Sequence, residues 1–306
     1  MSTNLCDLAT RLPLLIGRLL DREAKLKRGR FREETMTDIL TGALGAFAGP
    51  ELLIEYPVEL NTGGDLDLRF WHAASGRDLH IRLQAKRLNA ATNAGKPVGV
   101  ASRSYAELLH KPPSSSVPQY KTLAATAAPI IPLYMFYNHQ SVVDDPFHSG
   151  PGPVVSGVNL AFAADIAREL DRKVAAAGKI PKQVLHHKRL KHLRTHFFGL
   201  DAILCPSGDW EGAGVPAPNL VSASLRNRWN DGTRNGPSTI ADDQILRRLS
   251  EPLRMLPSSG DRRRPADGSA VRVDKALDRP VITFISGRTD DDRTPLIYDA
   301  PWAGAR

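Results

Sequence analysis

The sequence predicts an α/β fold in which a central mixed sheet is flanked by helices and the core follows the element order αβββαβ. Apolar residues recur at helical spacing through residues 31–47, and three strand-like segments follow over residues 52–88. A further helix and an apolar strand complete this order by residue 138. We expect the rest of the chain to form a mostly helical C-terminal elaboration.

The patterns divide the chain into three predicted parts. Residues 1–30 are expected to form an N-terminal amphipathic helix with a basic end. Residues 31–140 hold the predicted core, and residues 141–306 form a basic, mostly helical extension packed on that core. No internal repeat or clear linker separates the three parts.

The predicted core begins with a helix in which Met36, Leu40 and Leu44 share one face, and a Gly-Pro pair ends this helix. A hairpin turn is expected at Ala74–Arg77. The elements around this turn are predicted strands at Leu52–Leu60, Asp65–His72 and Leu79–Leu88, a helix at Pro118–Ala127 and a strand at Ile130–Asn138.

The C-terminal half shows weaker patterns. Its predicted elements are a helix at Gly157–Ala176, a strand at Leu200–Cys205, a helix at Asp242–Met255 and a strand at Pro280–Ser286. A strongly basic segment, Lys179–Phe198, and a charged loop, Ser258–Gly268, lie between these elements.

Composition limits the partners and the location of the protein. The 306 residues carry a formal net charge of +8 and a pI of about 9.6, which favours polyanionic partners, although many basic proteins bind none. No apolar run reaches the roughly 18 residues of a membrane span, and the N-terminal apolar stretch lacks the features of a signal peptide. Cys6 and Cys205 lie far apart, which argues against a disulfide scaffold and suits a reducing cytoplasm.

Four polar side chains are predicted to converge on one face of the hairpin. If the turn is centred on Ser75-Gly76, Asp65 lies opposite Lys86 and Asp67 lies opposite Gln84, and alternation places all four side chains together. Burying such groups without partners costs several kcal/mol. A bound cation would offset this cost.

This set of side chains suits metal-dependent hydrolysis of a phosphodiester. Oxygen atoms of Asp65, Asp67 and Gln84 are suitable ligands for Mg²⁺, and Mn²⁺ is expected to substitute for it. A bound Mg²⁺ lowers the pKa of its water and contacts the phosphate. Lys86 beside the metal can orient the attacking water and stabilise developing negative charge.

The preceding helix supplies a candidate for the negative charge that glutamine lacks. Glu33 lies on the same helical face as Met36 and Leu40 and should point toward the sheet, whereas Glu34 lies about 100° further round and should face solvent. Both glutamates are kept as candidate catalytic residues, with Glu33 preferred, because helix boundaries read from a sequence shift by a few residues.

The core motifs resemble the PD-(D/E)xK nuclease superfamily over residues 31–138. The glutamine form is similar to the Mrr-like restriction endonuclease branch, in which glutamine replaces the second acid, and the strand motifs also resemble an uncharacterised bacterial family associated with defence. One difference is a glycine where the superfamily commonly has a proline before its aspartate. The resemblance rests on Glu33-Glu34 in a helix, Gly64-Asp65 at the start of a strand and Gln84-Ala85-Lys86 in the next strand.

The resemblance implies a restriction-endonuclease-like αβββαβ core, dependence on a divalent metal and cleavage of DNA. By position it makes Asp65 the metal-binding aspartate, Gln84 the residue in place of the second acid and Lys86 the catalytic lysine. It places the helix glutamate at Glu33 or Glu34. Many enzymes of this type dimerise to cut both strands, so a homodimer is expected by analogy.

The basic segment is a candidate surface for binding DNA. A row of phosphate-contacting cations and an ordinary solvated helix face explain its composition equally well. The candidate nucleic-acid-binding residues are Lys188, Arg189, Lys191 and Arg194.

The leading interpretation is a cytoplasmic, Mg²⁺-dependent DNA endonuclease that acts against phage or other foreign DNA, with companion defence proteins as further partners. The missing second acid keeps open a catalytically inactive nucleic-acid-binding module that retains the nuclease fold. A third interpretation is a regulatory subunit whose basic face binds a protein. Gln119 and Lys121, at the start of the second core helix, are weaker candidates for a place near the site.

Overall fold

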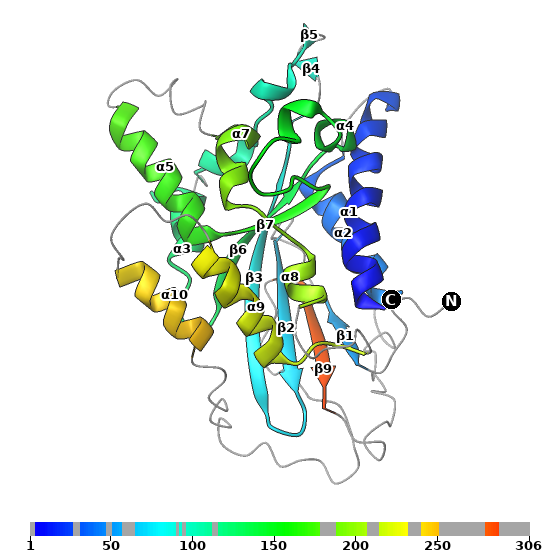
Figure 1. Ribbon diagram of the computed structural model, residues 1–306, viewed down its shortest axis with the longest axis vertical. Helices are drawn as coiled ribbons and strands as arrows, with labels where there is room; N and C mark the ends of the chain where they lie inside the picture. The colour runs from blue at the N-terminus through cyan, green and yellow to red at the C-terminus, as the bar shows by residue number, and fades with distance from the viewer. Residues whose placement is uncertain are drawn as a thin grey trace, which may run out of the picture.

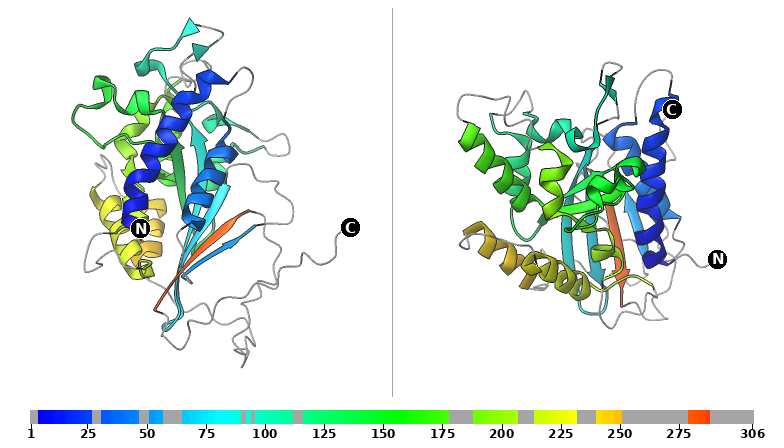
Figure 2. Two further views of the ribbon diagram at one scale, coloured as in Figure 1. Left: turned by 90° about the vertical axis from the view of Figure 1, so that its right-hand side faces the viewer. Right: turned by 45° about the horizontal axis from the view of Figure 1, so that its top comes forward.

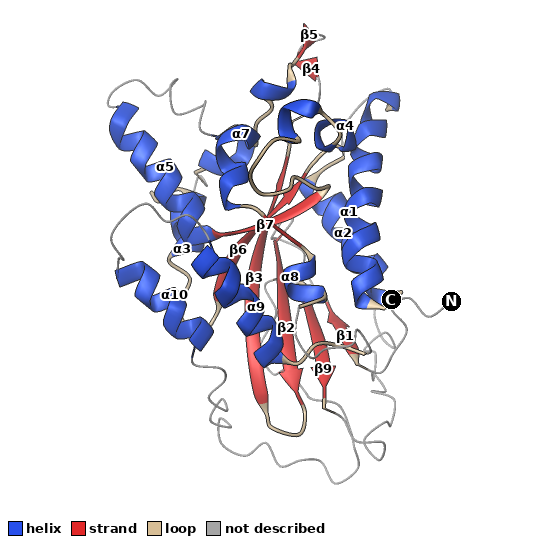
Figure 3. Cartoon of the chain, in the orientation of Figure 1, coloured by secondary structure: helices blue, strands red, loops and turns tan. Residues whose placement is uncertain are grey.

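A seven-stranded mixed sheet runs through the centre of the protein, and helices pack against both of its faces (Figures 1 and 3). The structure, a computed structural model, describes residues 4–26, 31–46, 51–56, 65–89, 92–93, 96–111, 116–177, 188–206, 214–231, 240–250 and 279–287. The predicted α/β class with a central mixed sheet is confirmed. Gly64, the predicted loop at residues 258–268 and part of the basic segment, residues 179–187, lie outside the described ranges.

The strand order in the sheet is β1-β9-β2-β3-β6-β7-β8. A separate two-stranded sheet contains β4 (Thr92–Asn93) and β5 (Lys96–Pro97). The strands of the main sheet are β1 (Leu52–Glu55), β2 (Asp65–His72), β3 (Arg77–Arg87), β6 (Ile131–Tyr137), β7 (Val158–Phe162), β8 (Phe198–Gly199) and β9 (Val281–Ser286).

The helices fall into a longer and a shorter group. The longer helices are α1 (Leu5–Asp21), α2 (Glu33–Gly45), α5 (Ala163–Ala177), α9 (Pro218–Asp231) and α10 (Ile240–Ser250). The shorter helices are α3 (Gln119–Ala124), α4 (Gln140–Val143), α7 (Leu190–Leu193) and α8 (Asp201–Leu204). Single 3-10 turns include η1 (Arg22–Lys25) and η3 (Ala106–Leu109).

The described elements of the core follow the predicted order α2, β1, β2, β3, α3 and β6. Strands β2 and β3 form an antiparallel hairpin, and β3 pairs in parallel with β6, which requires the crossover that contains α3. Strand β9 is inserted between β1 and β2, antiparallel to β1 and parallel to β2. A strand separated from β2 by about 200 residues of sequence therefore lies inside the predicted core.

Two apolar clusters cover opposite faces of the sheet. Because successive side chains of a strand alternate, Leu133 and Met135 of β6 join one cluster while Tyr134 and Phe136 join the other. The first cluster packs under α1, α2, α8, α9 and α10, and the side views show α9 and α10 side by side (Figure 2). The second cluster includes residues of α3, α5 and α7.

The register of the β2–β3 hairpin differs from the predicted register by two residues. Asp65 pairs with Gln84, and Asp67 pairs with Arg82. The reason is the position of the turn: Gly76 adopts a φ of 65° at the end of the turn, where its N–H bonds to the carbonyl of His72 at 2.8 Å. The turn is therefore centred one residue earlier than Ser75-Gly76, which moves every cross-strand pair by two residues.

Two predicted elements of the C-terminal half are wrong. The predicted helix at Gly157–Ala176 begins instead as β7 and continues as α5, and the predicted strand at Leu200–Cys205 is α8. Every residue of β7 is buried, so its sequence has no polar alternation to mark it as a strand. Short apolar runs of this kind do not distinguish a strand from a helix.

The three predicted parts share one core. Helix α1 places Leu12, Ile16 and Leu20 in the same apolar cluster as Leu68 of β2 and Phe284 of β9. Within the described ranges, no helix is both long and apolar enough to cross a lipid bilayer.

Cys6 of α1 and Cys205, which follows α8, form a disulfide with a Cα–Cα distance of 4.8 Å. Sequence spacing did not indicate this pair, because the two residues are separated by 199 positions and are brought together only by packing of α1 on α8. Disulfides persist mainly in oxidising environments, so cysteine usage no longer supports a reducing cytoplasm.

We expect the double substitution Cys6→Ser and Cys205→Ser to lower the free energy of unfolding by about 3–5 kcal/mol, because the crosslink closes a very long loop in the unfolded chain. Urea denaturation measures this loss. A reductant should destabilise the wild type and leave the double variant unchanged, and thiol labelling of the denatured, unreduced wild type should find no free cysteine. Two reactive thiols in that assay would contradict the pairing.

Candidate active site

Asp65, Gln84 and Lys86 lie on one face of the sheet, where β2 begins and β3 ends. Asp65 and Gln84 are direct cross-strand partners, and the Gln84 amide donates a hydrogen bond to the Asp65 carboxylate. Lys86 follows two residues later in β3, so its side chain emerges on the same face. On the opposite face, Leu83 and Ala85 are buried in the first apolar cluster.

Helix α2 and helix α3 each bring one side chain to Lys86. The Lys86 Nζ atom lies 3.6 Å from Glu33 Oε2 and donates to Gln119 Oε1 at 3.4 Å. Glu33 Oε1 also accepts a hydrogen bond from the backbone N–H of Arg87 at 3.1 Å. Glu34, in contrast, is exposed. The structure therefore brings Glu33, and not Glu34, to the lysine.

The two carboxylates of this cluster are short of positive charge. Burial raises the pKa of Asp65 to about 6, although Lys86, Arg279 and the hydrogen bond from Gln84 oppose the rise. Burial also raises the pKa of Glu33, against the opposing effects of Lys86 and of the Arg87 backbone N–H. Lys86 itself is only 4% exposed. A further cation between the two carboxylates would stabilise the ionised forms of both acids.

Two buried polar atoms at the site have no hydrogen-bond partner within the described part of the chain. They are Gln84 Oε1 and the hydroxyl oxygen of Tyr134, which is the β6 neighbour of Gln84 in the sheet. Burial raises the pKa of Tyr134, and the nearby Asp65 raises it further. Buried polar atoms in folded proteins are normally hydrogen-bonded, so this pair indicates a place for a further ligand.

The residues fit a divalent cation that prefers oxygen ligands. The Asp65 carboxylate, the Glu33 carboxylate and the unpaired Gln84 Oε1 are all oxygen donors of the type that Mg²⁺ binds. In the described ranges no three His, Cys, Asp or Glu side chains form a metal-binding group. A metal site here therefore depends on the glutamine as its third protein ligand.

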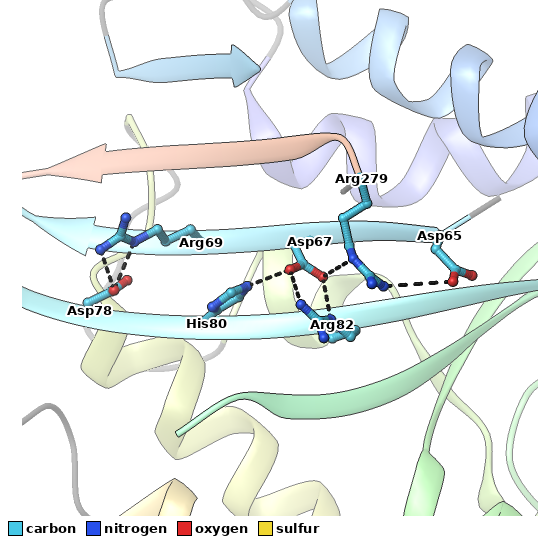
Figure 4. Close-up of polar contacts among 7 residues, drawn as sticks. All are labelled: Asp65, Asp67, Arg69, Asp78, His80, Arg82 and Arg279. Carbon is cyan, nitrogen blue, oxygen red and sulfur yellow. Dashed lines mark hydrogen bonds and ion pairs between the residues drawn. The ribbon is translucent and has the colours of Figure 1, made fainter. Parts of the chain in front are cut away.

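Asp67 lies on the same face but belongs to a different set of contacts (Figure 4). Its carboxylate accepts hydrogen bonds from Arg82 Nε at 3.0 Å, Arg82 Nη2 at 2.8 Å and His80 Nε2 at 2.8 Å. Burial alone would raise the pKa of Asp67, but the hydrogen bonds from His80 and Arg82 outweigh burial and lower it. Asp67, predicted as a metal ligand opposite Gln84, is instead compensated by its own cations.

The predicted DNA-binding residues lie in α7 and in the residues on either side of it. Arg194 donates to the carbonyls of Gly150 at 3.2 Å and of Pro151 and Pro153 at 3.5 Å. Burial lowers the pKa of Lys188, and the nearby Glu107 opposes this effect. Arg189 forms a β-bridge with Ser104, and Lys191 is the second residue of α7. Their binding of nucleic acid stays a prediction.

Sequence reasoning underrated one residue of the site, Gln119, and missed two others. Lys121, considered together with Gln119, instead forms an ion pair with Asp171 at 3.2 Å. Gln119 contacts Lys86 because α3 begins beside the end of β3, and only its place at the start of the second core helix pointed to this. Tyr134 gave no signal beyond the apolar strand that contains it. Arg279 lies 3.7 Å from Asp65 only because β9 enters the sheet beside β2, which no local pattern shows.

Fold and site together define an α/β protein with a buried carboxylate–glutamine–lysine cluster on a mixed sheet. The chain belongs to the family of unknown function DUF6615, whose model matches residues 5–289. Comparisons with curated proteins and with solved structures gave no match. The family match runs from the start of α1 past the end of β9, so the inserted strand is part of the unit that defines the family.

We expect Asp65→Asn to stabilise the protein at neutral pH in the absence of divalent metal. The folded-state pKa of Asp65, about 6, is above its ordinary value of 3.8. The stability linked to its protonation is therefore full below pH 3.8 and lost as the pH rises through 6. The variant should gain about 3 kcal/mol over the wild type between pH 4 and pH 8. Urea denaturation in EDTA across this range measures the gain.

Asp67→Asn is the matched control, two residues away on the same face. Because the folded-state pKa of Asp67 is lowered, its contribution is present at neutral pH and is lost as the pH falls below its ordinary value. The two variants should therefore respond to pH in opposite directions. A difference between Asp65→Asn and wild type that does not change with pH would contradict the proposed environment of Asp65.

Proposed function

We propose that this protein is a Mg²⁺-dependent nuclease that hydrolyses phosphodiester bonds in DNA. The observation that carries the proposal is the cluster in which Lys86 lies between Glu33 and Gln119 beside the hydrogen-bonded Asp65–Gln84 pair. The resemblance to the PD-(D/E)xK superfamily assigns roles to these same positions. The observed αβββαβ order supports that resemblance.

Each residue of the cluster has a distinct task in this proposal. Asp65, Glu33 and Gln84 Oε1 would hold the Mg²⁺ ion, which when bound supplies a Lewis acid and a water of lowered pKa. Lys86 would donate a hydrogen bond to the attacking water or to a phosphate oxygen and would stabilise the negative charge that develops there. Gln119 keeps the Lys86 ammonium directed to this point through its 3.4 Å hydrogen bond.

Some parts of this proposal rest on the resemblance and on charge alone. They are DNA as the substrate, action against foreign DNA, a homodimer, and companion defence proteins as separate partners. The net charge of +8 supports a polyanionic substrate through counterion release. A cytoplasmic place of action follows from a defence role. The Cys6–Cys205 disulfide counts against that location, because such bonds are rare in reducing compartments.

A second candidate function is a nucleic-acid-binding module without catalytic activity. Gln84 favours this candidate, because an amide in place of a carboxylate leaves the site with two acids, Asp65 and Glu33, to attract a metal. Such a module would bind DNA in a salt-dependent manner and would not cut it with any divalent cation.

Purified protein should nick supercoiled plasmid in Mg²⁺ or Mn²⁺ and not in EDTA. Lys86→Ala should lower the rate by about 100-fold or more, because the charge beside the reacting phosphate is lost. Glu33→Gln should lower it by about tenfold or more through weaker metal binding. Agarose electrophoresis of the plasmid forms measures both rates.

Glu34→Gln is the control for Glu33→Gln, since both residues open α2 and Glu34 is exposed. Its rate should equal that of the wild type. If Lys86→Ala cuts as fast as the wild type, a contaminating nuclease is responsible and the proposal fails. If DNA binds and is never cut, the binding module is the better description.

Metal binding should be visible as stabilisation without any substrate. Mn²⁺ at about 100 times its dissociation constant should raise the free energy of unfolding by about 2.7 kcal/mol. Asp65→Asn should abolish this gain, while Asp67→Asn should keep it because Asp67 is already paired with Arg82 and His80. Thermal denaturation with and without Mn²⁺ tests this expectation, and an equal gain in both variants would contradict it.

A further inference from the structure

A ladder of charged side chains runs from the candidate site along the hairpin (Figure 4). It combines acidic and basic side chains on the face that carries Asp65. The ladder consists of Asp65, Asp67 and Arg69 on β2, Asp78, His80 and Arg82 on β3, and Arg279, which precedes β9. Strand β9 thus adds one cation from a distant part of the sequence.

The two arginines that the hairpin contributes to the ladder, Arg69 and Arg82, each lie at short distance from one acid. Arg69 donates a hydrogen bond through Nε to Asp78 Oδ2 at 2.8 Å, and its Nη2 forms an ion pair with the same oxygen at 2.7 Å. Arg82 bonds to both oxygens of Asp67 at 3.0 and 2.8 Å. Such two-point contacts fix a guanidinium in place and neutralise it locally.

Arg279 makes a different kind of contact with the carboxylates of the ladder. Its Nη1 lies 3.7 Å from Asp65 Oδ2, and its Nε lies 4.0 Å from Asp67 Oδ1. Both distances are longer than a hydrogen bond, so with these two acids Arg279 forms ion pairs only. Asp67 already has its hydrogen bonds from Arg82, so the charge that Arg279 brings mainly serves Asp65.

The backbone of Arg279 is anchored while its side chain reaches the site. The carbonyl of the next residue, Pro280, accepts a hydrogen bond from the Asp67 N–H at 2.9 Å, and Val281 pairs with Asp67 in the parallel ladder. The side chain of Arg279 is 14% exposed. Because the backbone next to Arg279 is held in the sheet, its guanidinium stays within reach of the Asp65 carboxylate and of an anion bound beside that carboxylate.

We propose that Arg279 is a ligand for the phosphate of the nucleic acid, and that in the metal-free protein it instead neutralises Asp65. The inference rests on the proposed function. A divalent cation bound to Asp65 would repel a guanidinium 3.7 Å from that carboxylate, whereas a phosphate offers two oxygens that match its planar donors. Metal and substrate together would therefore move Arg279 from the acid to the phosphate.

The first test measures Mn²⁺ affinity of the intact protein without nucleic acid, by isothermal titration calorimetry. Arg279→Ala should bind Mn²⁺ about 5- to 10-fold more tightly than wild type, because the competing cation is gone. Arg279→Lys keeps the charge and should bind Mn²⁺ nearly as wild type does. Arg69→Ala is the matched control: it removes an arginine from the same face, and its partner is Asp78.

The second test measures binding of a short duplex DNA by fluorescence anisotropy in Ca²⁺, used as a cation that does not support cleavage. Arg279→Ala should bind the duplex about tenfold more weakly, and Arg279→Lys should recover part of the loss because an ammonium cannot make the two-point contact. Arg69→Ala should bind as wild type does.

The outcomes separate this inference from the proposed function. If wild type binds Mn²⁺ and Arg279→Ala binds it equally well, the inference fails and the proposed function stands. Equal DNA affinity of the two proteins also overturns the inference. If wild type binds no Mn²⁺, the proposed function and the inference fall together. Should Arg279→Ala not fold, Arg279→Gln removes the same charge with a side chain of similar polarity and decides the same measurements.

Discussion

The candidate site depends on the compensation of buried carboxylates by a single buried lysine. Sheet alternation sends Leu83 and Ala85 into one apolar cluster, which forces Gln84 and Lys86 onto the other face of β3. There Lys86 must serve Asp65 and Glu33 together, with Arg279 adding a smaller contribution at Asp65, and the pKa of each acid stays above its ordinary value because burial outweighs these charges. Helices α2 and α3 pack beside β3 and place Glu33 and Gln119 in contact with Lys86. Without either helix, Lys86 would lose one of these two polar partners.

The local part of this arrangement could be predicted from the sequence. Alternation along β3 placed Gln84 and Lys86 on one face, and the helical spacing of Met36 and Leu40 favoured Glu33 over Glu34. Both inferences use periods that are set within one element. The α/β class and the core order follow from the same periods, since β3, α3 and β6 each carry a pattern that is readable within about ten residues.

The predictions that were wrong or missing concern contacts between elements far apart in the sequence, or the geometry of one turn. The left-handed Gly76 ends the turn instead of occupying its centre, which gives Asp67 the partner Arg82 in place of Gln84. No period in the sequence indicates that β9 enters the sheet between β1 and β2 or that Cys6 meets Cys205. The prediction of β7 failed for a local reason. Both faces of this strand are buried, so its sequence lacks the alternation that would have marked it as a strand.

Asp65 and Asp67 lie two residues apart on the same strand face and have pKa shifts in opposite directions. This contrast identifies Asp65 as the carboxylate whose charge is not fully compensated within the protein. Asp67 receives three hydrogen bonds from His80 and Arg82, so its charge is compensated within the hairpin. Asp65 receives an amide hydrogen bond from Gln84 and longer-range help from Lys86 and Arg279, which leaves its pKa near 6. If Asp65 served only as a structural ion pair, we would expect it to receive short hydrogen bonds from neighbouring cations, as Asp67 does. The environment of Asp65 costs stability at neutral pH, and such a cost is expected where a carboxylate is kept available for a ligand.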